Sequence, residues 1–216
     1  MGAQLNYCCR EIADLSAREE ILNAADKLFG EVGFDAASTR EIAELSGVNK
    51  ALIHYHFKSK DGLLENVLDR YYEKLNITFQ KALKKDGGLR DKLMRLIDAY
   101  VDFLARNLNF SKIVQRESSG GKHMDRVSRN MVPIFQIGME LVQEAYPDAN
   151  SGDMAPHHLL VSFYGMIISY FTYSGVLEHL IGKNPLSKKE LEKRKRHLYR
   201  MLDIVLEAMS DENSGQ

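Results

Sequence analysis

Polar and aromatic side chains gather between residues 38 and 60, in the sequence STREIAELSGVNKALIHYHFKSK. Basic side chains outnumber acidic ones in this stretch: Arg40, Lys50, Lys58 and Lys60 against Glu41 and Glu44. Lysine, arginine, tyrosine and histidine are the donors that proteins use to contact DNA phosphates. The whole chain of 216 residues has a net charge of −1, which excludes a globally basic nucleic-acid coat. Any nucleic-acid binding must therefore come from this local stretch.

The same stretch predicts two short helices joined by a tight turn. Ser38 is expected to cap a helix over 39–45, and Asn49 a second helix over about 50–56. Ala43 is small enough for the two helices to cross closely, and Gly47, four residues on, can adopt the positive φ that the turn needs. The pattern predicts a helix-turn-helix with bounds 38–57. Its second helix is expected to enter the major groove of DNA.

The predicted DNA contacts lie in three places on this motif. They are at the N-terminus of the first helix, on the outer side of the second helix, and at its far end with the turn that follows. Two short helices joined at a glycine also occur in domains that bind no DNA, but Tyr and His next to two lysines are unusual for a plain solvated face. The expected contacts are Thr39, Arg40, Lys50, Ala51, His54, Tyr55, His56 and Lys60.

The rest of the chain is also predicted to be helical, because it lacks alternating strand patterns bounded by turn dipeptides. A helix over 16–32 is expected to begin at Ser16, in a capping box with Glu19, and to stop at Gly33. Further helices are expected over 60–85, 89–106, 110–117, 124–146, 156–181 and 187–210, with a flexible loop at 118–121. The chain is therefore predicted to be all-α, with an N-terminal extension (1–15), a helix-turn-helix domain (16–60), a larger helical domain (61–210) and a frayed tail (211–216).

Residues 159–177 carry no charge and approach the length of a membrane-spanning helix. Their many hydroxyl groups, and the lack of a flanking basic cluster, favour a buried helix of a soluble bundle instead. Cys8 and Cys9 are adjacent and cannot build the disulfide framework of a small secreted domain. They are expected to be free thiols in a reducing cytoplasm, with a strained bond between them as the alternative. The N-terminus lacks the apolar core of a signal peptide.

Three motifs around the short helices resemble the tetracycline-repressor (TetR) family of bacterial transcription regulators. They are F-x-E-x-G-F-x-x-A-S-T over 29–39, REIA-x-x-SGV over 40–48, and Tyr-His-Phe followed by Lys-Ser-Lys over 55–60. The resemblance implies a three-helix DNA-binding head and a helical body that binds a small effector and forms the dimer. It also assigns the eight predicted contacts to family positions that face phosphates or bases, although the family often has Tyr where His54 stands.

By the same resemblance, helices 156–181 and 187–209 are expected to pair with their copies in a four-helix dimer interface. The residues point the same way, because one helix is apolar all round and the other carries an apolar stripe. The alternative is an ordinary core within one chain. The expected interface residues are Gly165, Ser169, Leu198, Met201, Leu202 and Val205.

Methionine and aromatic side chains of the body are the candidates for an adaptable apolar effector pocket, although such residues usually form only a core. Arg116, Glu117 and His123 are candidates to face a polar ligand group, against the more ordinary role of solvated or ion-paired side chains. No cofactor is expected, and the sequence gives little support for a metal at His157, His158 and His179. The candidate pocket residues are Tyr100, Phe103, Gln115, Met131, Phe135, Met139, Phe163, Tyr164, Met166, Ile167, Tyr170 and Phe171.

The sequence therefore predicts a ligand-responsive DNA-binding regulator, most often a repressor in this family. Its expected partners are double-stranded operator DNA with an inverted repeat, a second copy of the chain and an unidentified small molecule, without a membrane. Two alternatives stay open: a helical enzyme, and an adaptor that keeps the head only as a structural unit. The motifs G-x-S-x-G, H-E-x-x-H and G-x-x-x-x-G-K-[ST] are not present, which disfavours the enzyme.

Overall fold

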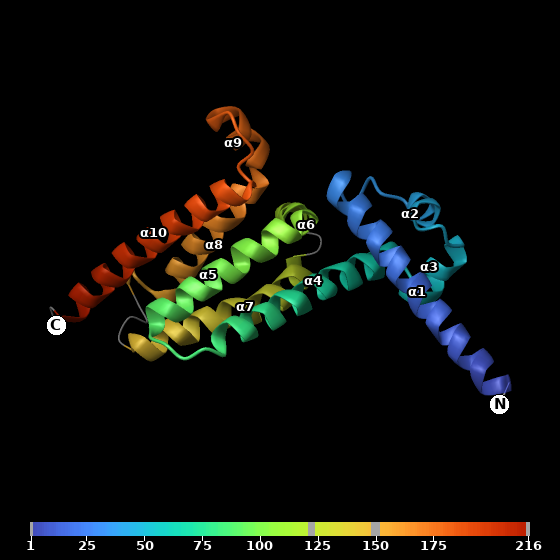
Figure 1. Cartoon of the computed structure of the whole chain (residues 1–216), viewed down its shortest axis with the longest axis horizontal. Helices are drawn as coiled ribbons and strands as arrows, with labels where there is room; N and C mark the ends of the chain where they lie inside the picture. The colour runs from blue at the N-terminus through green and yellow to red at the C-terminus, as the bar shows by residue number, and fades with distance from the viewer. Residues whose placement is uncertain (1, 121–123, 148–151, 215–216) are drawn as a thin grey trace. The chain divides into compact units, whose positions relative to one another are not determined.

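The computed structural model describes residues 2–120, 124–147 and 152–214, and side chains over 14–118, 124–147 and 152–211. Over the described residues the chain forms ten α-helices and no strand, which confirms the predicted all-α class, although nine helices were expected (Figure 1). The helices are α1 (Gly2–Glu31), α2 (Thr39–Ser46), α3 (Lys50–Phe57), α4 (Lys60–Leu83), α5 (Leu89–Arg106), α6 (Leu108–Gly120), α7 (Met124–Ala145), α8 (Pro156–Thr172), α9 (Ser174–Ile181) and α10 (Lys188–Ser214).

The chain divides into two compact units. The first unit, which we call the head, contains residues 1–71 and 112–127, and the second, which we call the body, contains residues 72–111 and 128–216. The predicted boundary after residue 60 therefore differs from the observed division. Helices α4, α6 and α7 each contribute residues to both units, which a boundary drawn along the sequence does not capture.

Helix α1 is longer than predicted. Its helical backbone runs continuously from Gly2, so Ser16 lies inside the helix and does not cap it. The reason lies in the sequence, because neither glycine nor proline occurs between residues 3 and 29 and nothing forces the helix to begin at Ser16. The predicted extension 1–15 is thus the first half of α1. The structure describes side chains from residue 14 onward, so the expectation that Cys8 and Cys9 are free thiols stays a prediction.

The turn chemistry of α2 and α3 is as predicted. Ser38 and Glu41 form a reciprocal capping box at the start of α2, and Gly47 ends that helix in the left-handed conformation at φ 70°. The Asn49 side chain accepts a 2.9 Å hydrogen bond from the backbone N–H of Ala51 at the start of α3. Ile42 and Ala43 are buried where α2 packs in the head.

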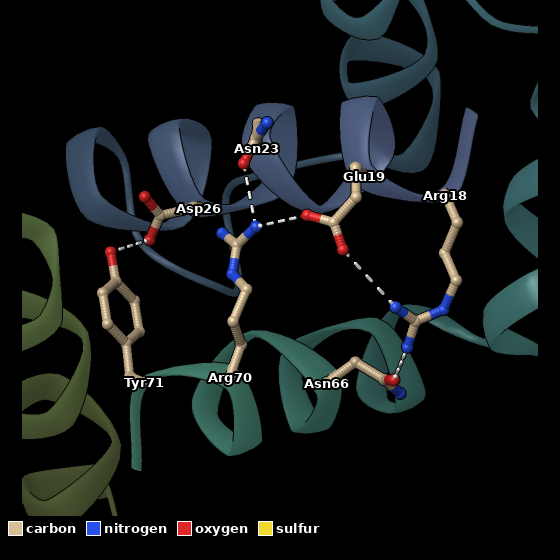
Figure 2. A network of polar contacts seen from close by, with 7 residues as sticks. All are labelled: Arg18, Glu19, Asn23, Asp26, Asn66, Arg70 and Tyr71. Carbon is tan, nitrogen blue, oxygen red and sulfur yellow. Dashed lines mark hydrogen bonds and ion pairs between the residues drawn. The ribbon is translucent and has the colours of Figure 1, made fainter. Parts of the chain in front are cut away.

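A polar network joins α1 to the first half of α4 within the head (Figure 2). Arg70 donates a 2.8 Å hydrogen bond to Asn23 and lies 3.3 Å from Glu19, and Tyr71 donates a 2.5 Å hydrogen bond to Asp26. Beneath these contacts Leu63, Leu64, Val67 and Leu68 are fully buried. The network fixes the register of the first half of α4 against α1 within the head.

The core of the body forms around α5, which packs against both α10 and α8 (Figure 1). Leu104 of α5 and Leu198 of α10 are fully buried, and Leu202 is 3% exposed. Lys195 is buried beside them and its ammonium lies 2.8 Å from the Asp102 carboxylate. The stripe of α10 therefore faces its own chain, which is the alternative to the predicted dimer contact at Leu198 and Leu202.

The apolar segment 156–181 was expected to form one helix, but it forms two. Helices α8 and α9 meet at Tyr173 with a bend of 72°. Weak helix formers, Thr172, Ser174 and Gly175, flank the break. Among the described residues no single helix is long and apolar enough to cross a membrane. Taken together, α8 and α9 reach the length and apolar composition of such a helix, but the pair is bent by 72°.

Two helix ends also differ from the prediction. Helix α6 continues to Gly120 where a flexible loop was expected, and Ser118 supports it with a 2.7 Å hydrogen bond from its hydroxyl to the carbonyl oxygen of Val114. Helix α10 continues to Ser214 instead of ending at residue 210. The last two residues of the predicted tail lie outside the described residues.

Candidate nucleic-acid interface

Helix α3 separates the side chains that could meet DNA from those that hold the helix in place. Ile53 and Phe57 are buried in the head. On the opposite side Lys50, Ala51 and His54 are exposed, as the prediction requires. An eight-residue helix that exposes a lysine, an alanine and a histidine on its outer side has the dimensions of a major-groove recognition helix.

The N-terminus of α2 presents a second exposed group. Arg40 is exposed and forms a 2.9 Å ion pair with Glu44 one turn later, which raises the pKa of its guanidinium through the hydrogen bond and the opposite charge. Ion pairs this exposed contribute little, so a phosphate competes well for the arginine. Thr39, beside it, is half-buried. The Glu41 carboxylate is already used by Ser38, whose hydrogen bonds lower its pKa.

His56 faces inward, which differs from the predicted phosphate contact. Its side chain is 7% exposed, and Nε2 lies 3.3 Å from Asp14 Oδ1 of α1, although the two atoms are not aligned for a hydrogen bond. Its ring packs against the rings of Tyr55 and Phe57. A helix periodicity places His56 three residues from Ile53 and thus on the buried face of α3. In this structure His56 packs α3 onto α1.

Lys60 is also occupied within the head. Its ammonium donates hydrogen bonds to the carbonyl oxygens of Phe34, Asp35 and Ala37 at 2.8, 3.3 and 2.9 Å. It also lies 4.4 Å from the centre of the Phe34 ring. An ammonium group has three N–H donors, and all three are used here. Lys60 therefore holds the connection between α1 and α2, and through it the position of the α2 N-terminus.

Lys58 is a candidate that was counted in the charge balance but not among the predicted contacts. It is the non-glycine residue of the described chain with a positive φ, 66°, and it follows the last turn of α3. Its ammonium donates a 3.0 Å hydrogen bond to the carbonyl oxygen of Tyr55 and lies 5.9 Å from that ring. Tyr55 itself is 62% exposed. A tyrosine and a lysine thus project together from the C-terminal end of α3.

This geometry has a counterpart among known proteins. Residues 21–67 match the family model described as bacterial regulatory proteins, tetR family. Over these residues the chain is similar to the tetR family. The matched residues contain all of α2 and α3, the end of α1 and the start of α4.

Of two similar proteins, one is named a transcriptional activator and the other a transcriptional repressor. The chain is 34% identical over 87 residues to the HTH-type transcriptional activator FasR of Mycolicibacterium smegmatis, covering 40% of each chain. It is 30% identical over 115 residues to the HTH-type transcriptional repressor NicS of Pseudomonas putida, covering 53% of this chain and 54% of that protein. The chain thus spans about half the length of the relatives it matches.

A solved structure extends the likeness in fold to the body. The fatty acid degradation regulator FadR of Bacillus halodurans superposes with a TM-score of 0.69 over 86% of this chain and 93% of that chain, at 16% identity. Identity this low relates the folds alone. The likeness in fold covers both the head and the body of this chain.

The predicted pocket residues do not gather in one place. Tyr100, Phe103, Ile167 and Phe171 are buried in the body, and the rings of Tyr100, Tyr164 and Phe135 pack together. Met131, Met139 and Phe163 are half-buried, as is Met166. Tyr170 turns elsewhere, because its hydroxyl donates a 3.1 Å hydrogen bond to the carbonyl oxygen of Pro185.

The polar ligand candidates lie in the head, apart from the predicted body pocket. Gln115, Arg116 and Glu117 belong to the 112–127 segment of the first unit. Arg116 donates to the carbonyl oxygens of Phe29 and Gly30 at 3.2 and 3.4 Å. His123 lies outside the described residues. Within the described residues no group of three or more metal-ligating side chains gathers, although the rings of His157 and His158 are 4.1 Å apart.

An open groove on the body does not match the predicted apolar pocket either. Arg90 crosses it and binds Asp203 with two hydrogen bonds of 2.6 and 3.0 Å, which lower the pKa of that carboxylate. Its lining is mostly charged, which suits ordered ions and water better than an apolar effector. The lining residues are Arg90, Asp203, Leu206, Glu207, Ser210 and Asp211.

Proposed function

We propose that this chain is a transcriptional regulator that binds double-stranded operator DNA through the outer face of α3 and the N-terminus of α2. One observation carries the proposal: Lys50, His54 and Tyr55 are exposed together on a helix whose opposite face is buried in the head. Arg40 and Lys58 supply positive charge at the two flanks of that helix. Because bacterial DNA lies in the cytoplasm, the proposal locates the protein there.

The direct test is selection from random DNA. Incubating the full chain with a pool of random duplexes, and sequencing the bound fraction over several rounds, is expected to enrich one inverted repeat. A variant with Lys50, His54 and Tyr55 all changed to Ala is expected to enrich none. If the native chain enriches no sequence, and binds DNA no better than the triple variant, the alternatives of an enzyme or a structural adaptor gain ground.

The chain is further proposed to act as a homodimer through an exposed apolar surface of α8 and α9. Val161, Val176 and Leu180 are 60%, 65% and 77% exposed. Monomeric proteins rarely leave several large apolar side chains exposed on neighbouring turns. A Cβ built at Gly165 meets no atom within 4 Å, so this predicted interface residue lies at an open surface of α8. Two copies would present two heads to the two halves of an inverted repeat.

The body is proposed to sense a small molecule and to pass the signal to the head. Helix α4 runs from the head into the body, and residues 112–127, between body segments in the sequence, pack in the head. Arg116 at one end of this segment binds carbonyl oxygens of α1, and Arg126 at the other end donates a 3.0 Å hydrogen bond to the carbonyl oxygen of Asp61 in α4. A ligand shifts the DNA-binding equilibrium only by its differential affinity for the two states, for which about 1–3 kcal/mol is typical.

The chain is proposed to repress transcription rather than to activate it. The support is that the relatives include named repressors such as NicS, although FasR is named an activator. The sign depends on where the operator lies relative to a promoter, which is not a property of the chain. A reporter gene placed behind the selected operator, with and without the protein, measures it directly.

A further inference from the structure

Three tyrosines from three helices form a cluster in the body: Tyr72 of α4, Tyr100 of α5 and Tyr164 of α8. The rings of Tyr100 and Tyr164 stack with their centres 6.2 Å apart. After burial, the interaction with Tyr164 raises the pKa of both Tyr72 and Tyr100. Aromatic side chains surround them, with Phe110 against Tyr72 at 5.3 Å and Phe135 against Tyr164 at 5.4 Å. We call these three residues the tyrosine cluster.

The hydroxyl of Tyr72 has no partner within the described structure. Tyr72 is only 5% exposed, and its hydroxyl oxygen is buried without a hydrogen bond. The hydroxyl of the neighbouring Tyr71 donates a hydrogen bond to Asp26. Tyr71 and Tyr72 are consecutive and lie on different sides of α4, so only Tyr71 reaches this carboxylate. Burying an unpaired hydroxyl costs stability, and such groups in native proteins usually have a ligand, an ion or a water as partner.

We infer that the tyrosine cluster is the polar end of the effector site and that it selects a neutral, apolar molecule carrying a carbonyl oxygen. The inference rests on the proposed function of the body as an effector-binding unit and adds the chemical class of the effector. A carbonyl oxygen has two lone pairs and no donor, so it complements hydroxyl groups that have protons to give.

The charges around the cluster decide between a neutral ligand and an anion. Burial, followed by the neighbouring tyrosines, raises the pKa of Tyr72 and Tyr100, and burial alone raises the pKa of Tyr164 to about 12. The hydroxyls therefore keep their protons at physiological pH and serve as donors. Among the described residues, no arginine, lysine or histidine contributes to these shifts. A carboxylate bound among these tyrosines would have to lose its hydration, which is unfavourable unless a counter-charge pairs with it.

The apolar part of the ligand has a matching surface beside the cluster. Met131, Phe135 and Met139 are spaced four residues apart and lie on one face of α7. All three are half-buried, and Phe135 packs edge-on against the Tyr164 ring. Methionine side chains are flexible and adapt to irregular apolar shapes. Tyr164 is itself half-buried, so part of its side chain is accessible in the described structure.

Matched pairs of small molecules test the inference on the full chain. The probes are 2-decanone, 4-phenylcyclohexanone and 1-decalone, paired with decanoate, 4-phenylcyclohexanecarboxylate and decahydronaphthalene-1-carboxylate, and binding is measured by calorimetry. The expected result is that ketones bind and that each binds more tightly than its paired carboxylate. Binding of no ketone, or tighter binding of the carboxylates, would overturn the inference.

Tyrosine-to-phenylalanine variants locate the binding. Tyr72→Phe is expected to weaken ketone binding about tenfold, the loss of one hydrogen bond to a buried acceptor. Tyr173→Phe, which changes an exposed tyrosine of the same unit, is the matched control and is expected to bind as the native chain does. Equal affinities for all three proteins would overturn the role of the cluster.

The melting temperature shows whether the Tyr72 hydroxyl waits for a ligand or already stabilises the fold. Without ligand, Tyr72→Phe is expected to raise the Tm, because it removes a buried unpaired hydroxyl. A lowered Tm would mean that a bound water already satisfies this hydroxyl, and would contradict the inference. DNA binding is measured on the same proteins. If the native chain binds ketones selectively but no DNA, the proposed regulatory function fails while the ligand class stands.

Discussion

The ammonium group of Lys60 donates a 2.8 Å hydrogen bond to the backbone carbonyl oxygen of Phe34 and lies 4.4 Å from the centre of the same residue's ring. Two further carbonyl oxygens of the α1–α2 connection accept from the same ammonium. The lysine at the first position of α4 therefore fastens a connection that lies more than twenty residues earlier in the sequence. This contact sets the position of the α2 N-terminus, where Arg40 is presented.

Replacing this lysine is expected to destabilise the head. Lys60→Met keeps much of the apolar stem but removes three charge-assisted hydrogen bonds, and should lower the free energy of unfolding by about 2 kcal/mol. Urea unfolding measures the change, with Lys50→Met as the control because Lys50 is exposed, and exposed substitutions change stability by less than about 0.5 kcal/mol. Native stability together with weaker DNA binding in Lys60→Met would instead support the predicted phosphate contact.

The dimer surface is expected to depend on α9 and not on the buried stripe of α10. Leu180→Glu should give a folded monomer in analytical ultracentrifugation, because this leucine is 77% exposed. Leu202→Glu should unfold the body, because a charge would be buried at a site that is 3% exposed. Leu45→Glu, an exposed apolar residue of the head, is the matched control and should stay dimeric. A dimeric Leu180→Glu would move the interface away from α9.

Arg116 is expected to matter for signalling more than for DNA affinity. Arg116→Met removes the hydrogen bonds to the last carbonyl oxygens of α1 and leaves the outer face of α3 untouched. We expect operator affinity within about threefold of the native value, while the effect of a bound ligand on that affinity shrinks by about 1 kcal/mol. Operator titrations with and without saturating ligand give both quantities. A large loss of affinity with undiminished coupling would assign Arg116 to the stability of the head alone.

The helix-turn-helix could be predicted from sequence because its determinants are local. Ser38, Asn49 and Gly47 act on backbone groups within three residues of themselves, so cap and turn preferences are sufficient to place α2 and α3. The side on which His56 lies follows from helical periodicity relative to Ile53 as well, although its aromatic and basic neighbours favoured a DNA contact instead. Local propensity thus predicts the elements better than it predicts which face is covered.

The remaining differences depend on contacts between distant residues. The three carbonyl partners of Lys60 lie 23 to 26 residues away, and nothing in its own neighbourhood announces them. An apolar stripe such as Leu198 and Leu202 has the same spacing whether α5 or a second chain covers it. The bend between α8 and α9, and the joining of residues 112–127 to the head, are likewise decided by packing and not by a residue pattern.

Salt-dependent DNA binding tests the central claim most directly. The logarithm of the binding constant for the selected operator, plotted against the logarithm of the salt concentration, gives a slope of about −0.9 for each phosphate contact. For a dimer, Lys58→Ala should reduce the magnitude of the slope by about 2 and weaken all sequences alike. Lys50→Ala should cost about 1–3 kcal/mol at one operator position and relax the preference there. The native slope and the native preference in both variants would contradict the account, because α3 would then not be the surface that meets DNA.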